Sequence, residues 1–154
     1  GKIVIGLCLG GQLLADAIGG KVTANPCKEI GWFPIRLSGR ARQSPLFSFF
    51  PENPIVFQWH GDTFSELPQE AECIASSAAC EHQAFVYKKR VFGFQYHLEN
   101  TAEIVGGLIK NCAGEMIPGT YVQTPEEVAA HPEYIKQDNK WMNMFLTQLK
   151  KMYE

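Results

Sequence analysis

The sequence predicts an α/β fold, and two observations carry this prediction. Short runs rich in Ile, Val and aromatic residues, typical of strands, are mixed along the chain with segments whose apolar residues recur at helical spacing. No internal repeat, low-complexity stretch or linker divides the 154 residues. We therefore expect residues 1–154 to belong to a single domain built around one hydrophobic core.

The first elements follow from local pattern. Lys2–Leu7 is a short apolar run that predicts a buried strand. Gly10–Ile18 has the spacing of an amphipathic helix, whose apolar face would consist of Leu13, Leu14, Ala17 and Ile18. Lys28–Leu37 reads as a strand or hairpin arm. A short helix is expected over Ser44–Phe50, because a proline stands at its first position.

The rest of the chain continues this mixture. Further strands are predicted at Ile55–Trp59, Glu72–Ser77, Ala84–Lys88 and Val91–His97. Asn100 or Thr101 can cap a helix that runs to about Cys112, and Thr124 can cap another. Glu133–Tyr153 predicts a last long helix, with a stripe formed by Trp141, Phe145, Leu146 and Leu149. Residues 115–154 are thus expected to form a helical tail.

Composition excludes several classes of protein. The chain is 45% hydrophobic and 19% charged with a net charge of −2, which is typical of a globular protein. No basic patch points to nucleic acid, and the Lys88–Arg90 triplet is interpreted as a solvated hairpin turn. No apolar run approaches the ~18 residues of a membrane span, and the run after Lys2 is too short for a signal peptide.

The cysteine pattern bears on the cellular compartment. Five cysteines occur, an odd number without a C-x-x-C pair, so neither a disulfide framework nor a zinc knuckle is indicated. Reduced thiols in the cytoplasm fit this pattern best. At least one thiol is then free to take part in chemistry.

A candidate nucleophile stands between the first strand and the first helix. The segment Gly6–Gln12 (GLCLGGQ) has the G-x-nucleophile-x-G pattern of a sharp strand-to-helix turn, with Cys8 in the nucleophile position. Small neighbours allow the strained backbone of such a turn. The N-terminus of the helix would favour a thiolate and a developing oxyanion. The alternative interpretation is a buried cysteine in a glycine-rich turn.

A candidate base lies at the end of a later strand. His97 and Glu99 stand at i and i+2, which places both side chains on one face, so that Glu99 can orient the imidazole. His60 is a rival, because it is also predicted to end a strand and has Asp62 at i+2. A metal site built from Cys8, His60, His97 and Glu99 is disfavoured, because no short metal-ligand spacing pairs them.

Together these segments resemble the class I, or triad-type, glutamine amidotransferase family. Gly6–Gln12 matches the G-x-C-x-G-x-Q signature of that family, and Gln95–Glu99 (QYHLE) matches its second signature, with Leu98 in place of the usual proline. Trp59–Asp62 (WHGD) and Cys80–Phe85 (CEHQAF) resemble the stand-alone branch related to the amidotransferase domain of GMP synthase. The likeness extends from residue 1 to about residue 110.

The resemblance implies a three-layer, flavodoxin-like fold and the hydrolysis of glutamine. It assigns the nucleophile to Cys8, the base to His97 and the orienting carboxylate to Glu99, and an oxyanion donor to the N–H group of Leu9. Glutamine would be held by Gln12 and by the backbone around Trp59, Gly61 and Asp62, which makes His60 a residue of the substrate pocket and not the base. No cofactor is expected. No ATP-binding loop is present, so a synthase activity is expected on a partner, unless the chain is a bare glutaminase or γ-glutamyl hydrolase.

The resemblance also implies an N-terminal part that this sequence lacks. Family members carry βα elements before the Cys turn, including a glycine-rich loop that supplies a second oxyanion donor. Without a preceding unit, one flank of the Lys2–Leu7 strand is expected to be an exposed edge. Residues 1–154 alone are therefore expected to hydrolyse glutamine poorly and to aggregate or pair as a homo-oligomer.

Three functional hypotheses remain open at this point. The first is a glutaminase that supplies ammonia to an acceptor substrate or a synthase partner. The second is a γ-glutamyl peptide hydrolase, which would use the same cysteine and histidine on a different substrate. The third is a non-catalytic interaction module that keeps the fold without turnover.

Overall fold

A five-stranded sheet forms the centre of the computed structural model, which describes residues 1–154. Its strands, in spatial order, are β1 (Val4–Leu7), β7 (Val91–Phe94), β6 (Ala84–Tyr87), β5 (Ala71–Ser76) and β3 (Arg36–Leu37). β1 and β7 run parallel, whereas the other neighbouring pairs are antiparallel. Residues 88–90 form the turn of the β6–β7 hairpin, as predicted.

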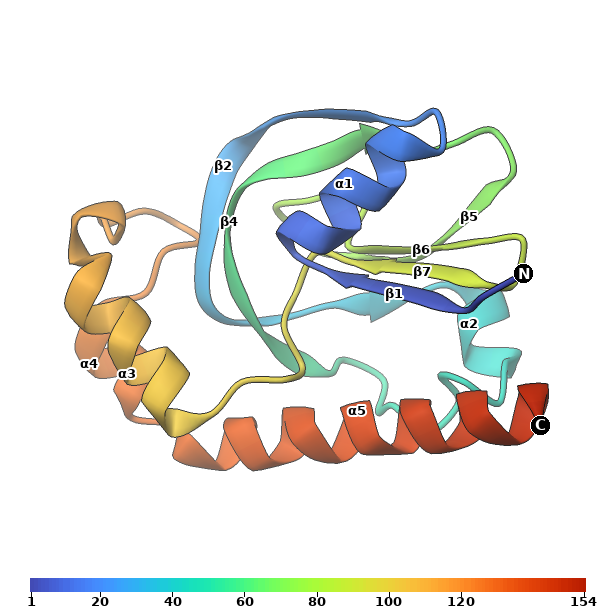
Figure 1. The fold of residues 1–154 in the computed structure, drawn as a ribbon. Helices are drawn as coiled ribbons and strands as arrows, with labels where there is room; N and C mark the ends of the chain where they lie inside the picture. Colours follow the sequence, from blue (N-terminus) through green and yellow to red (C-terminus); the bar gives the residue numbers. More distant parts are fainter.

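Two long antiparallel strands, β2 (Lys21–Pro34) and β4 (Ile55–Glu66), form a second, strongly curved sheet (Figure 1). Both are longer than the sequence predicts. The pattern indicated only the second half of β2, because the register shifts between Ala24 and Glu29 and this irregular stretch contains Asn25 and Pro26. β4 does not end at Trp59, so the predicted strand end before His60 is wrong.

The helices are α1 (Leu9–Ala17), α2 (Gly39–Gln43), α3 (Ala102–Asn111), α4 (Pro125–Ala129) and α5 (Pro132–Tyr153), with a 3-10 turn η1 at Ala113–Glu115. Thr101 caps α3, and Thr124 caps α4 through a capping box with Glu127. The helix expected over Ser44–Phe50 is wrong. A helix forms just before it, capped by Ser38, and Ser44 is extended because Pro45 disfavours helical backbone in the preceding residue.

The molecule has three layers, which confirms the predicted α/β class. α1 and the outer part of the β2–β4 sheet cover one face of the central sheet, where Ala15, Phe64 and Phe85 pack together. α5 and α2 cover the other face. There Trp141, Phe145 and Leu149 of α5 join the largest cluster of buried apolar residues, whereas Leu146, expected in the same stripe, is exposed.

β1 lies at one edge of the central sheet and pairs only with β7. Apolar side chains near this edge are open to solvent. Val4 is 38% exposed, and Leu13, expected on the packed face of α1, is 61% exposed. No helix of the structure combines the length and the apolar character needed to cross a bilayer.

A glycine in β7 allows the aromatic packing on the α1 face of the sheet. Gly93 pairs with Phe85 across the β6–β7 hairpin, and the Phe85 ring lies over the position that a Gly93 side chain would occupy. A Cβ atom at Gly93 would stand 2.1 Å from the ring, which is itself fully buried. The strand that leads to the candidate base therefore depends on glycine here.

Gly93→Ala is expected to lower the free energy of unfolding by about 1–3 kcal/mol, as overpacking of a filled core does. Gly106→Ala in α3 is the matched control, because nothing lies within 4 Å of its Cβ position. Alanine is the better helix former, so this control should be neutral or stabilising by up to ~1 kcal/mol. Urea unfolding measures both. A Gly93→Ala variant as stable as the parent would show that the Phe85 ring can move aside.

Candidate active site

Cys8 occupies a strained turn between β1 and α1. Its φ of 47° and ψ of −110° lie outside the regions that residues with a side chain normally adopt. Two backbone hydrogen bonds hold it there: its N–H donates to Phe94 O at 2.8 Å, and its carbonyl accepts from Gln12 N at 3.0 Å. Sequence and structure thus agree on a strained candidate nucleophile at a helix N-terminus.

Two of the three glycines around Cys8 are needed for close packing. A Cβ atom at Gly6 would lie 2.4 Å from Gly10 O, and one at Gly11 would lie 2.9 Å from Phe94 O. Gly10 has open space around its Cβ position, so close packing does not require a glycine there. The glycines at 6 and 11 let the first turn of α1 pack directly against the ends of β1 and β7.

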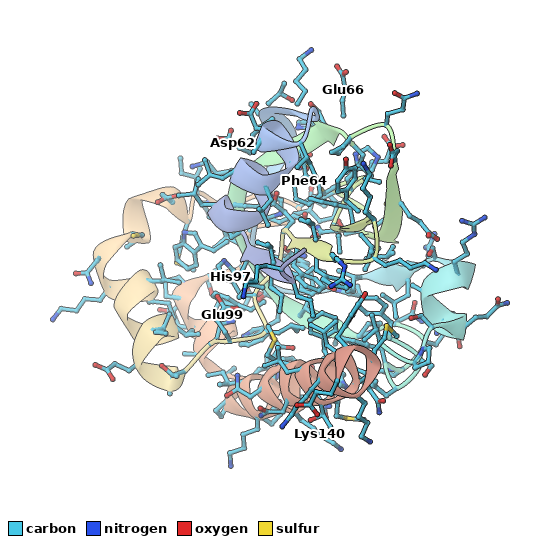
Figure 2. All side chains as sticks on the ribbon, turned by 45° about the vertical axis from the view of Figure 1, so that its right-hand side comes forward. Asp62, Phe64, Glu66, His97, Glu99 and Lys140 are labelled. Carbon is cyan, nitrogen blue, oxygen red and sulfur yellow. The ribbon has the colours of Figure 1, made fainter.

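His97 and Glu99 lie side by side in the segment that follows β7 (Figure 2). His97 Nδ1 and Glu99 Oε1 are 2.7 Å apart. The predicted strand to His97 is wrong in extent, because β7 ends at Phe94 and the chain then crosses to β4, where His97 N donates to Phe57 O at 2.9 Å. The expected juxtaposition of the two side chains is nevertheless present.

The electrostatics of this pair favour a charged imidazole. Burial of the His97 ring opposes the charge, but hydrogen bonds to Cys8 and Glu99, together with their charges, outweigh it and raise the pKa of His97 to about 9. Burial likewise acts to raise the pKa of Glu99, but the hydrogen bond and charge of His97 outweigh it and lower that pKa. Both Cys8 and Glu99 therefore lie close enough to the His97 ring to favour its charged form.

The β4 segment Trp59–Asp62 lies beside the nucleophile. Cys8 Sγ is 3.7 Å from Trp59 O, and Gln12 Nε2 donates to Asp62 O at 3.1 Å. Gln12 also donates to Gln95 Oε1 at 3.2 Å. The Gln12 side chain therefore ties α1 to this segment and to the strand end that precedes His97. The structure thus places Gln12 close to Cys8, together with the backbone of Trp59–Asp62. This predicted glutamine-binding segment is called the substrate arm below.

His60 is placed differently from the sequence expectation. Its side chain is 1% exposed and lies within β4 rather than at a strand end. Nδ1 donates to the backbone oxygen of Asp62 at 2.9 Å, and Nε2 is 3.0 Å from Glu29 Oε2. The exposed Asp62 carboxylate is not its partner. Both ring nitrogens are thus engaged behind the substrate arm, which disfavours His60 as the rival base.

Glu29, which sequence reasoning missed, anchors a buried polar network. Its carboxylate is fully buried and accepts hydrogen bonds from Ser77 Oγ at 2.7 Å and Gln83 Nε2 at 2.6 Å. Gln83 Oε1 accepts in turn from Gln58 Nε2 at 3.0 Å. Gln83 lies in the noted Cys80–Phe85 segment, but nothing local to Glu29 indicated that its strand position faces inward.

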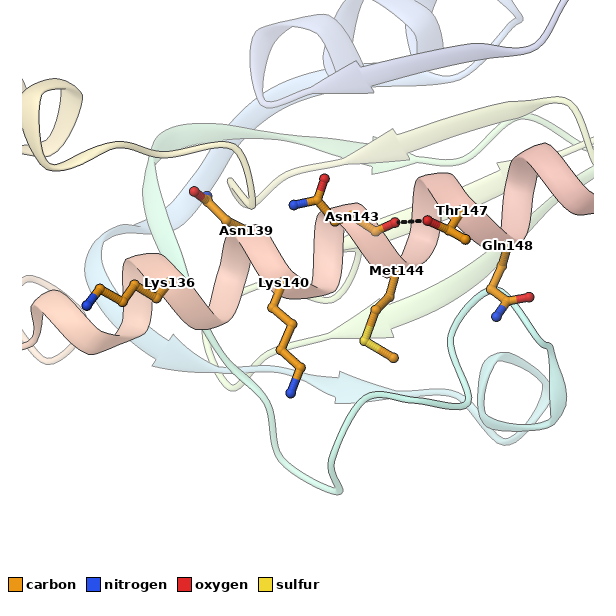
Figure 3. Close-up of a pocket in the computed structure, with 7 residues that line it drawn as sticks. All are labelled: Lys136, Asn139, Lys140, Asn143, Met144, Thr147 and Gln148. Atoms are coloured by element: carbon orange, nitrogen blue, oxygen red, sulfur yellow. Dashed lines mark hydrogen bonds between the residues drawn. The ribbon is translucent and has the colours of Figure 1, made fainter.

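A hollow on the outer side of α5 is separate from these residues (Figure 3). It is lined by Lys136, Asn139, Lys140, Asn143, Met144, Thr147 and Gln148. None of the predicted site residues belongs to it. No group of three or more His, Cys, Asp or Glu side chains in the structure is arranged to hold a metal ion.

Comparison with known proteins identifies the family. Residues 1–112 match the family described as "Glutamine amidotransferase class-I". The chain belongs to the class I glutamine amidotransferase family. The match includes both segments that contain the candidate catalytic residues, Gly6–Gln12 and Gln95–Glu99.

Relatives of this amidotransferase chain agree with that assignment. It is 40% identical over 115 residues to the "Putative glutamine amidotransferase-like protein YfeJ" of Salmonella typhimurium, covering 75% of this chain and 48% of that protein. It is 33% identical over 132 residues to a GMP synthase of Caldicellulosiruptor saccharolyticus, covering 80% of this chain and 25% of that protein. The chain thus spans half or less of the length of these relatives.

Solved structures show the same fold. A glutamine amidotransferase from Methylobacillus flagellatus has a TM-score of 0.87 at 33% identity, covering 97% of this chain and 62% of that one. A glutamine amidotransferase from Thermotoga maritima has a TM-score of 0.80 at 31% identity, covering 94% and 61%. The class I glutamine amidotransferase fold predicted from the motifs is confirmed.

The His97–Glu99 pair predicts a measurable titration. The His97 imidazole should titrate with a midpoint near pH 9, above its ordinary 6.5. Because the folded pKa is the higher one, the stabilising contribution of the charged ring is complete below about pH 6.5 and is lost as the pH rises through about 9. Proton NMR of the ring as a function of pH measures the midpoint.

Glu99→Gln removes the negative partner and should lower the His97 midpoint by roughly one pH unit or more. Glu133→Gln serves as the control, because Glu133 pairs with His131 at a distant, exposed position. A midpoint that does not move in Glu99→Gln would contradict the coupling described for the pair.

Proposed function

We propose that this chain hydrolyses the side-chain amide of glutamine through a covalent thioester on Cys8. The observation that carries the proposal is the strained cysteine at a helix N-terminus, together with a histidine whose pKa both Cys8 and Glu99 raise and whose ring nitrogen Nδ1 lies 2.7 Å from Glu99 Oε1. A thiol with an adjacent, oriented base is the arrangement of a cysteine nucleophile. Membership of the class I family supports glutamine as the amide donor.

In the first half-reaction the proton of the Cys8 thiol resides on His97, whose raised pKa favours the imidazolium, and the Cys8 thiolate attacks the amide carbon of glutamine. The carbonyl oxygen becomes an oxyanion, which the N–H of Leu9 stabilises, since the first N–H groups of α1 have no acceptor within the helix. The intermediate then collapses. The carbon–nitrogen bond breaks as His97 transfers its proton to the departing nitrogen. Ammonia is released, and a γ-glutamyl thioester remains on Cys8.

The second half-reaction regenerates the enzyme. His97 takes a proton from water, which attacks the thioester carbonyl, and the carbon–sulfur bond breaks to give glutamate and the Cys8 thiolate beside the protonated His97. Throughout, Glu99 accepts the hydrogen bond of His97 Nδ1, so that Nε2 faces the reacting atoms. The charge on Glu99 also stabilises the imidazolium that forms in each half-reaction.

Recognition of glutamine is assigned to the arm beside Cys8. Gln12 and the backbone groups of Trp59, Gly61 and Asp62 would hold the substrate, and the engaged His60 ring would keep the arm in place from behind. The ammonia would pass to an acceptor substrate or to a synthase partner, as the similarity to GMP synthases suggests.

Selective labelling of Cys8 is the first expected result. A glutamine-like alkylating analogue should modify Cys8 in the full-length protein and spare the other four cysteines. Burial raises the pKa of Cys73 and raises that of Cys80 to about 11, which disfavours their reactive thiolates. Peptide mass spectrometry measures the sites of labelling. Equal labelling of all five cysteines would rule out a specially activated Cys8.

Kinetics should separate the two histidines. His97→Ala is expected to lower kcat for glutamate release by a factor on the order of 10² or more, as loss of a general base does. Glu99→Gln should lower kcat with little change in KM. His60→Ala should raise KM, because it removes the support of the substrate arm. Glutamate release in the full-length protein measures all three.

Two outcomes would overturn these assignments. If His60→Ala abolishes turnover while His97→Ala retains it, the base is His60. If wild-type protein cleaves γ-glutamyl peptides much faster than free glutamine, the chain is a γ-glutamyl peptide hydrolase that uses the same residues. A substrate panel assayed beside the variants decides the second point.

A further inference from the structure

The segment that carries the proposed base and its partner has no regular secondary structure of its own. β7 ends at Phe94 and α3 begins at Ala102, so His97 and Glu99 lie in the irregular connection between them. A short His97–Glu99 contact in such a segment requires that its backbone be held by other elements. The contacts that hold it are therefore part of the functional geometry.

One side chain of α5 captures the carbonyl groups on both sides of Glu99. Asn139 Nδ2 donates to Leu98 O at 3.0 Å and to Asn100 O at 2.9 Å. A single amide group thus fixes the peptide units that flank the orienting carboxylate. Figure 3 shows Asn139 on the side of α5 that faces this connection, whereas Lys140 and Met144 point away from it.

The neighbouring residue of α5 reaches the same segment through β4. Asp138 Oδ2 accepts from the N–H of Phe57 at 3.2 Å, and the carbonyl of Phe57 accepts from the N–H of His97 at 2.9 Å. Asp138 is therefore one peptide unit removed from the backbone of the proposed base. Its side chain is fully buried, and its other oxygen has no partner within the protein.

Asp138 places a carboxyl group on the buried, apolar face of α5, where apolar packing gives no reason for it. It lies three residues before Trp141 and seven before Phe145, on the stripe that buries α5 against the sheet. Burial, reinforced by the nearby charge of Glu99, raises the pKa of its carboxyl to about 8. An apolar residue would bury more favourably in this position, so the carboxyl calls for an explanation other than helix docking.

We propose that Asp138 and Asn139 of α5 are positioning residues that hold the His97–Glu99 segment in its reactive geometry. The inference rests on the proposed function and extends it to the helix farthest along the chain. Asn139 holds the carbonyl groups on both sides of Glu99 by hydrogen bonds. Asp138 holds β4 at Phe57, whose carbonyl accepts a hydrogen bond from the N–H of His97. Asp138 is fully buried and the Asn139 amide is engaged by two carbonyl groups, so both would act through the placement of the base and its partner.

The experiment compares variants of the full-length protein in kinetics and in NMR. Asn139→Ala removes both carbonyl contacts, and kcat should fall about 10- to 100-fold with KM little changed, because a displacement of about 1 Å can cost that much. Asn143→Ala is the matched control. Asn143 is an exposed asparagine one turn farther along α5 that makes no side-chain hydrogen bond, so this change should leave kcat unaltered.

At the neighbouring position, two substitutions separate positioning from folding. Asp138→Asn keeps an oxygen that can accept from Phe57 N–H and should retain kcat within about threefold, a rescue expected of one retained hydrogen bond. Asp138→Leu removes the acceptor but suits the apolar stripe, so it should stay folded and still lose kcat. If Asp138→Leu keeps wild-type kcat, Asp138 does not position the base.

NMR of the His97 ring reads the geometry without turnover. In Asn139→Ala the titration midpoint of His97 should fall by roughly one pH unit, because the bond to Glu99 loosens. An unchanged midpoint together with an unchanged kcat overturns the positioning role. If wild-type protein releases no glutamate, the proposed function fails, and the midpoint in Asn139→Ala alone then decides whether α5 positions the pair.

Discussion

The parallel pairing of β1 with β7 is the constraint on which the candidate site depends. In this register Leu7 lies opposite Phe94, so both strands end at the same edge of the sheet. Cys8 follows the first strand directly, and the segment of His97 and Glu99 follows the second. The hydrogen bond from Cys8 N to Phe94 O joins the two strand ends. An antiparallel pairing would place the thiol and the imidazole at opposite ends of the sheet.

Around this pair, the other elements supply support rather than chemistry. α1 packs closely enough to place its N-terminus behind Cys8 only because Gly6 and Gly11 carry no side chains. The β2–β4 sheet brings its own backbone beside the thiol, and the buried Glu29–His60 contact stiffens it from the far side. α5 closes the opposite face and reaches the base segment through polar side chains. Each layer therefore helps to hold the candidate catalytic residues Cys8, His97 and Glu99 in place.

Local sequence indicated the candidate catalytic residues but not their support. His97 and Glu99 stand two residues apart, and the structure brings their side chains together as expected. The local pattern left His60 as a rival base, and the family resemblance favoured His97. The supporting roles of Glu29 and Asp138 could not be predicted from their neighbours, because their partners lie far away in sequence, at His60 and Phe57. The one available signal for Asp138 was a carboxylate in an otherwise apolar helical stripe. The length of β4 was missed because its continuation past His60 depends on pairing with β2.

The proposed hydrolysis of glutamine requires a covalent γ-glutamyl intermediate on Cys8, and this intermediate can be trapped. The full-length protein would be mixed with isotopically labelled glutamine, quenched in acid within its first turnovers and digested for peptide mass spectrometry. A γ-glutamyl thioester is expected on the peptide that contains Cys8; it should be sensitive to hydroxylamine and absent from Cys8→Ala. Release of glutamate by Cys8→Ala at the wild-type rate, or a label on another residue, would contradict it.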